Sequence, residues 1–121
     1  MNDGAPNRIL RIMEMQRHAM LMYTSCGWFF DEISGIETTQ VLQYACRVIQ
    51  LANQIGEVDL ETEFIKQLEA APSNVSTYEN GAVVYNKSVL PSRTNLQRVG
   101  IHYAVSSIFE DEPDSLTIFN Y

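Results

Sequence analysis

Apolar residues recur at spacings of three and four positions over most of the chain, which is the period of an amphipathic helix. The first such segment runs from about Asn7 to Thr24. Charged residues separate its apolar positions, which are Ile9, Ile12, Met13, Met20 and Tyr23. The segment therefore predicts a helix with one apolar face.

A second helix is predicted to begin at Ser34, because Ser34 and Glu37 have the spacing of a capping box. In that motif the serine hydroxyl accepts a hydrogen bond from the Glu37 amide, and the Glu37 carboxylate accepts one from the Ser34 amide. We expect Gly56 to end this helix in a left-handed cap. The expected core stripe of the helix is Val41, Ala45, Val48, Ala52 and Ile55.

Two shorter helices are predicted next. Asp59 is placed to cap the first of them, and Pro72 lies beyond its end. The apolar stripe of this helix is Leu60, Phe64 and Leu68. The second short helix is predicted over residues 80–90, immediately before Pro91.

The last helix is predicted to open at a second capping box, formed by Thr94 and Gln97. Apolar residues occupy two of its faces, with Leu96, Val99 and Tyr103 on one and Ile101, Val105 and Ile108 on the other. A helix that is apolar on more than one face needs neighbours on more than one side. We therefore expect other helices to surround its middle.

The pattern changes at the C-terminus, where residues 113–121 alternate as in an extended strand and predict a short extended tail. The fold class predicted for residues 1–121 is all-α, a single domain built as a compact bundle of about five helices. The tail is rich in apolar and aromatic residues, whereas natural domains more often end in polar ones. We therefore expect the chain to be a fragment of a larger protein.

Composition and charge narrow the function classes. The chain has 121 residues, of which 45% are hydrophobic, so it is long enough to bury a core. Its formal charge of −7, without a cluster of basic residues, argues against nucleic acid as a partner. The weakly polar stretch from Ala19 to Phe30 is too short to span a membrane, and Asp3 and Glu14 interrupt any signal peptide. We expect a cytoplasmic protein with no membrane partner.

Cysteine and histidine spacing does not predict a metal site or a cofactor. Cys26 and Cys46 lie outside any paired motif, and we expect two buried thiols. His18 follows Glu14 by four positions, which places both on one face of the first helix, and His102 lies in the last helix. We expect both to be hydrogen-bonded structural histidines. No self-contained catalytic motif occurs in the chain.

The break between the first two helices, residues 23–38, gathers the only tryptophan of the chain with other aromatic and acidic residues. A tryptophan ring can stack on a sugar while a carboxylate accepts hydrogen bonds from its hydroxyls. One interpretation is therefore a substrate-binding platform made of Trp28, Phe29, Asp31 and Glu32. In the other, Trp28, Phe29 and Phe30 plug the end of the bundle and the carboxylates lie on its solvated rim.

Residues 13–22, 23–38, 41–52 and 96–109 together resemble a helical domain of unknown function, the DUF3536 type. That domain follows the catalytic domain in a subset of glycoside hydrolase family 57 proteins. The resemblance runs in order along nearly the whole chain, and residues 63–74 fit it as well. It implies that this chain is an accessory domain of a larger carbohydrate-active enzyme, with the N-terminal catalytic barrel of that enzyme as its partner.

The resemblance also bears on the site. The family's catalytic carboxylates lie on the barrel, so it implies that the isolated chain is inactive. In better-characterised relatives a Ser-Asp-Trp-aromatic segment lies near the substrate. Residues 25–29 are similar in outline, but only Trp28 matches closely enough to carry over. The alternative function is a structural or docking module that packs on the parent protein or on a second copy, without ligand contact. The direction of the Trp28 side chain distinguishes the two.

Overall fold

Helices make up most of the computed structural model, which describes residues 5–56 and 58–109. The predicted all-α class is confirmed, since the only β pairing in these two ranges is an isolated bridge between Pro72 and Asn80. In chain order the elements are α1 (Ala5–Leu21), α2 (Cys26–Phe29), α3 (Ile36–Gly56), α4 (Glu61–Leu68), α5 (Gly81–Val84), the π-helical turn η1 (Tyr85–Val89), the 3₁₀ turn η2 (Leu90–Ser92) and α6 (Leu96–Ser106).

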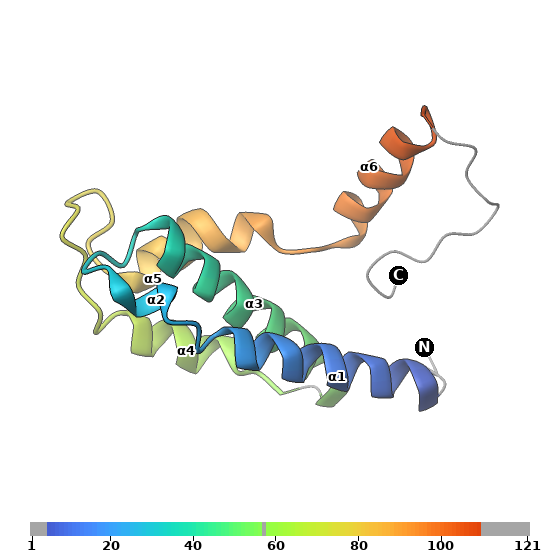
Figure 1. The fold of residues 1–121 in the computed structure, drawn as a ribbon, viewed down its shortest axis with the longest axis horizontal. Helices are drawn as coiled ribbons and strands as arrows, with labels where there is room; N and C mark the ends of the chain where they lie inside the picture. Colours follow the sequence, from blue (N-terminus) through green and yellow to red (C-terminus); the bar gives the residue numbers. More distant parts are fainter. Residues whose placement is uncertain (1–4, 57, 110–121) are drawn as a thin grey trace.

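The long helix α3 forms the centre of the bundle (Figure 1). Helix α1 packs along it, α2 packs near its N-terminus, and η1 packs against another side. The main buried cluster joins α3 to the α5–η1 helix and consists of Leu42, Cys46, Val84, Tyr85 and Val89. None of the described helices is both long and apolar enough to cross a membrane.

The buried face of α3 differs from the predicted stripe. Of the predicted positions, only Ala45 is fully buried, whereas Val41, Val48, Ala52 and Ile55 are half-buried. The fully buried residues of α3 are Leu42, Ala45, Cys46, Ile49 and Leu51. The difference arises because α3 has neighbours on more than one side, which widens and shifts the buried arc beyond a single stripe.

The predicted ends of α3 are partly correct. The helix ends at Gly56, but no described glycine has a positive φ angle, so the left-handed cap was wrong. At the other end the Ser34 amide donates to Oε1 of Glu32 at 2.8 Å, which replaces the predicted bond to Glu37. The Ser34 amide bonds to Glu32 and not to Glu37, because Glu32 lies in the turn that leads into the helix.

Of the predicted N-caps of the two later helices, one is confirmed and one is displaced by a residue. Asp59 caps α4 as predicted, because its carboxylate accepts hydrogen bonds from the amides of Glu61 and Thr62. Helix α6 is capped by Asn95, whose side chain accepts from the Arg98 amide at 2.9 Å, and not by Thr94. Asn is at least as good an N-cap as Thr, so the cap moved by one residue.

Helix α6 projects away from the bundle, so the prediction that other helices surround it was wrong (Figure 1). No residue of α6 is buried, and space around Gly100 is open. Arg93 and Asn95 have extended ψ angles of 132° and 169°, which carry the chain off the bundle before the helix begins. The predicted extended tail, residues 113–121, lies outside the described residues.

Candidate functional site

The break between α1 and α3 presents an exposed aromatic surface. Trp28 is 73% exposed, Phe29 is 74% exposed and Phe30 is 54% exposed. The rings of Phe29 and Phe30 lie edge to face, with their centroids 5.2 Å apart. The aromatic residues of this junction therefore point outward and do not plug the end of the bundle.

Close packing between α2 and α3 holds Trp28 in place. A Cβ atom on Gly27 would overlap the side chain of Val41, so glycine permits the two helices to approach this closely. The Thr38 hydroxyl donates a hydrogen bond to the Gly27 carbonyl at 3.2 Å. The short helix that carries Trp28 is thus fixed to α3 directly beside the tryptophan.

Glu32 ties the junction to the loop that follows α4. Its carboxylate accepts hydrogen bonds from the Ser73 hydroxyl at 2.6 Å, from the Asn74 amide at 2.7 Å and from the Ser34 amide. The Asn74 side chain also donates to the Asp31 carbonyl at 2.8 Å. These bonds, the one from Ser73 above all, lower the pKa of Glu32 to about 2. Glu32 is therefore ionised and engaged with the loop, while Asp31 is exposed at the rim.

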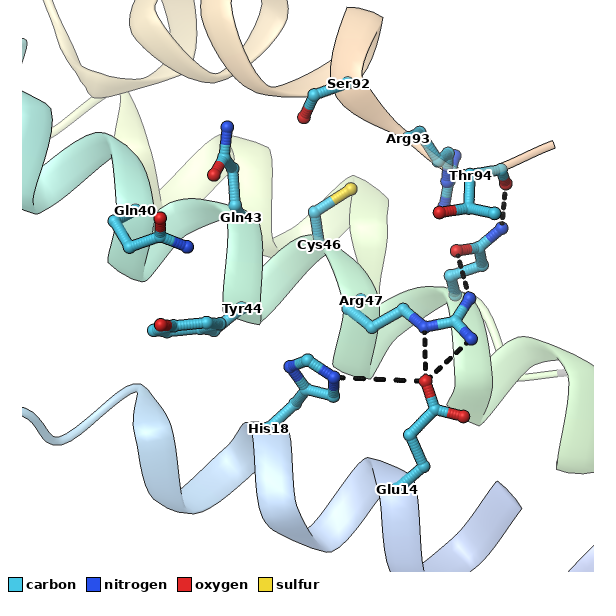
Figure 2. A pocket seen from close by; sticks show the side chains of 11 residues that line it. Glu14, His18, Gln40, Gln43, Tyr44, Cys46, Arg47, Ser92, Arg93 and Thr94 are labelled. Carbon is cyan, nitrogen blue, oxygen red and sulfur yellow. Dashed lines mark hydrogen bonds and ion pairs between the residues drawn. The ribbon is translucent and has the colours of Figure 1, made fainter. Parts of the chain in front are cut away.

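A cavity of about 270 Å³, lined mostly by polar residues, lies between α1, α3 and the end of η2 (Figure 2). Its lining includes His18 from α1, Gln43, Tyr44 and Arg47 from α3, and Ser92 and Thr94 from the segment after η1. Three separate parts of the chain therefore contribute side chains to one concave surface.

Hydrogen bonds in series connect the walls of this cavity. Arg47 donates to Oε1 of Glu14 from Nε at 3.0 Å and from Nη2 at 2.8 Å. The same guanidinium donates from Nη1 to Gln50 at 2.8 Å, and the Gln50 amide donates to the Thr94 carbonyl at 2.6 Å. Glu14, Arg47, Gln50 and Thr94 thus join α1, α3 and the linker before α6 (Figure 2).

His18 lies on α1, in the wall of the cavity that this helix forms. Its Nε2 atom is 3.9 Å from Oε1 of Glu14, which confirms the predicted shared face but is too long for a hydrogen bond. Its ring centroid lies 5.8 Å from that of Tyr44. The Nδ1 atom is buried and has no hydrogen-bond partner among the described residues, contrary to our expectation of a hydrogen-bonded histidine. Burial lowers the pKa of His18, so the ring is neutral at neutral pH.

The remaining candidates from the sequence are the two cysteines and His102. Both cysteines are free, but only Cys46 is buried, and the prediction of a buried Cys26 was wrong. His102 is exposed on α6. Within residues 5–56 and 58–109, no group of three or more His, Cys, Asp or Glu side chains is arranged to hold a metal ion.

The cavity was missed in the sequence because its residues come from three elements. One signal was present on α3, where Gln40, Gln43, Arg47 and Gln50 form a polar stripe at helical spacing beside the apolar one. Such a stripe is normally a solvated helix face. Here α1 and the end of η2 cover it, which turns it into a cavity wall.

Comparison with known proteins gives a family but no activity. Neither the curated proteins nor the solved structures contain a match to this chain. One family matches over residues 1–121, and its description is "Domain of unknown function (DUF3536)". The chain belongs to this family of domains of unknown function.

Proposed function

We propose that this chain is an accessory helical domain of a cytoplasmic, glycoside hydrolase family 57-like carbohydrate-active enzyme. In this proposal the domain helps to form or close the glycan cleft and is not catalytic by itself. The observation that carries the proposal is the 73% exposure of Trp28 at a helix junction whose backbone packs closely on α3. An exposed indole with a fixed backbone is suited to stacking on a sugar ring.

Each residue of the platform has a separate role. Trp28 stacks on the sugar, and Phe29 extends the apolar surface beside it. Asp31, exposed at the rim, accepts hydrogen bonds from hydroxyl groups. Glu32 acts as a positioning residue, because its carboxylate is engaged by Ser34, Ser73 and Asn74.

The chemistry belongs to the parent enzyme in this proposal. A retaining glycosidase needs two carboxyl groups about 5 to 5.5 Å apart on opposite sides of the scissile bond. Asp31 and Glu32 are adjacent residues of one turn, and the Glu32 carboxylate is hydrogen-bonded to Ser73. We therefore expect the catalytic pair on the N-terminal barrel, and no release of reducing sugar by the isolated chain.

The test is the activity of the parent protein on α-glucans, with this domain present and with it removed. Loss of kcat/KM on long glucans, with a smaller loss on a short aryl glucoside, would support a role in the glycan cleft. Equal activity of the two proteins on every glucan would contradict the proposal. Circular dichroism of the truncated parent controls for misfolding of the barrel.

A second candidate, a docking or oligomerisation module, is favoured by the exposed apolar residues of α1 and α6. Exposed apolar groups along α1 include Ile9, Leu10, Met13 and Met20. Large contiguous apolar surfaces on soluble domains often mark contact sites. Light scattering across a wide concentration range tests this candidate, and a monomer at every concentration would exclude self-association.

A further inference from the structure

We propose that the cavity between α1, α3 and residues 92–94 binds a small, neutral, polyhydroxylated ligand such as a single hexose unit. The lining of this cavity does not include Trp28, Phe29, Asp31 or Glu32. The inference therefore goes beyond the proposed function and does not depend on it.

The first argument is the set of polar groups without partners. The side-chain amides of Gln40 and Gln43, the Tyr44 hydroxyl and the Thr94 hydroxyl line the cavity and have no side-chain hydrogen bond within the described part of the chain. Each amide offers an acceptor and two donors, and each hydroxyl offers both functions. Neutral donors and acceptors in one cavity suit a ligand with several hydroxyl groups.

The second argument is charge. Glu14 is neutralised by Arg47 at 2.8 Å, and Arg93 is neutralised by Glu61 at 3.2 Å. His18 is neutral because burial lowers its pKa. The lining therefore carries no uncompensated charge. A phosphate or an ammonium group could form an ion pair here only by breaking an existing one. This favours a neutral ligand.

The third argument is size and shape. A volume of about 270 Å³ lies just below the range of about 300 to 1,000 Å³ typical of sites for drug-sized molecules. It suits one sugar ring and excludes a longer ligand from full burial. The Tyr44 ring, tilted 45° to the His18 ring, supplies an aromatic surface on one wall (Figure 2).

The fourth argument is rigidity. The bonds from Arg47 to Glu14 and from Gln50 to the Thr94 carbonyl connect the three walls of the cavity in the absence of a ligand. A site that is already formed loses less entropy on binding. For a molecule of hexose size we expect a low-millimolar dissociation constant, since small ligands gain little per atom outside optimised sites.

The experiment is an NMR titration of the 121-residue chain with D-glucose, with maltose and, separately, with inorganic phosphate. We expect saturable shifts of the Gln43 side-chain amide and of the His18 ring with glucose. Gln43→Met keeps the length of the side chain but removes its hydrogen bonds, and Thr94→Val does the same for the hydroxyl. Each should weaken glucose binding by about tenfold, the equivalent of one hydrogen bond in a partly dry site.

The same change at an exposed position, Gln67→Met on α4, is the matched control and should leave binding unchanged. Far-ultraviolet circular dichroism confirms that each variant is folded. The proposal is overturned if glucose causes no saturable shift, if binding survives Gln43→Met and Thr94→Val, or if phosphate binds as tightly as glucose. Shifts confined to Trp28 would support the junction as a sugar platform and would contradict the cavity proposal.

Discussion

The carboxylate of Glu32 accepts a 2.7 Å hydrogen bond from the backbone amide of Asn74, which lies 42 residues further along the chain. This bond, with the one from Ser73, fastens the loop after α4 to the turn that carries the exposed aromatic residues. Only an ionised carboxylate can accept all of these bonds without losing one to its own proton. The attachment of this loop to the turn after α2 therefore depends on the charge of Glu32.

We predict that Glu32→Gln lowers the melting temperature at pH 7 and flattens its acid dependence. The pKa of Glu32 falls from 4.5 to about 2 on folding. Stability from this group is therefore complete above pH 4.5 and is lost as the pH falls through about 2. Melting curves between pH 2 and pH 7 check this, with Glu69→Gln at an exposed position as the control. Identical pH profiles of wild type and Glu32→Gln would contradict it.

Protonation of His18 should destabilise the fold. Its pKa is lowered on folding, mainly by burial, while Glu14 opposes the shift and Arg47 adds to it. The folded state thus binds a proton less readily than the unfolded state, so stability is complete above pH 6.5 and falls at more acidic pH. His18→Leu should remove this component between pH 7.5 and pH 5. The matched change His102→Leu, at an exposed position, should leave the wild-type profile, and an equal effect of both changes would refute the assignment.

The hydroxyl of Tyr85 should contribute measurably to stability. Tyr85 is fully buried in the main cluster and donates a 2.9 Å hydrogen bond to Glu61, which also pairs with Arg93. We expect Tyr85→Phe to cost about 1 to 3 kcal/mol in urea unfolding, the usual range for a bond to a charged group. Tyr103→Phe on α6 is the control and should be neutral. A cost no greater than that of the control would show that the bond does not contribute to stability.

Truncation of a side chain should cost much more stability in the bundle than on α6. Leu51 has no exposed surface, so we expect Leu51→Ala to cost about 2 to 5 kcal/mol. Ile101 is 56% exposed, so Ile101→Ala should change stability by no more than about 0.5 kcal/mol. Urea unfolding of the two variants measures this difference. A large loss in Ile101→Ala would mean that α6 packs on the bundle in solution.

Helical period predicted the elements well because it depends on local sequence. Asp59 caps α4 and Gly56 ends α3, and both signals act within one or two turns. Side-chain burial was predicted less well, because it depends on which neighbours a helix acquires. On α3 the buried face includes Cys46, which the predicted stripe omitted, and on α6 no residue of the two apolar faces is buried.

In the two candidate sites, too, local features could be predicted from the sequence and contacts between distant residues could not. The junction was visible in the sequence because its aromatic and acidic residues are consecutive. The role of Glu32 was not visible, since Ser73 and Asn74 are distant in sequence. The cavity could not be placed from the polar stripe of α3 alone, because only the folded bundle brings His18 and Thr94 to the same space.

The most direct test of the glycan-facing role is Trp28→Ala in the parent enzyme, measured by both thermal unfolding and kinetics on α-glucans. Because the ring is mostly exposed, we predict a stability change of no more than about 0.5 kcal/mol. Loss of a stacked sugar should lower kcat/KM by about tenfold, which corresponds to about 1.4 kcal/mol, and Trp28→Phe should restore part of it. A large fall in melting temperature without a specific kinetic defect, or unchanged kinetics in a fully stable variant, would contradict the account.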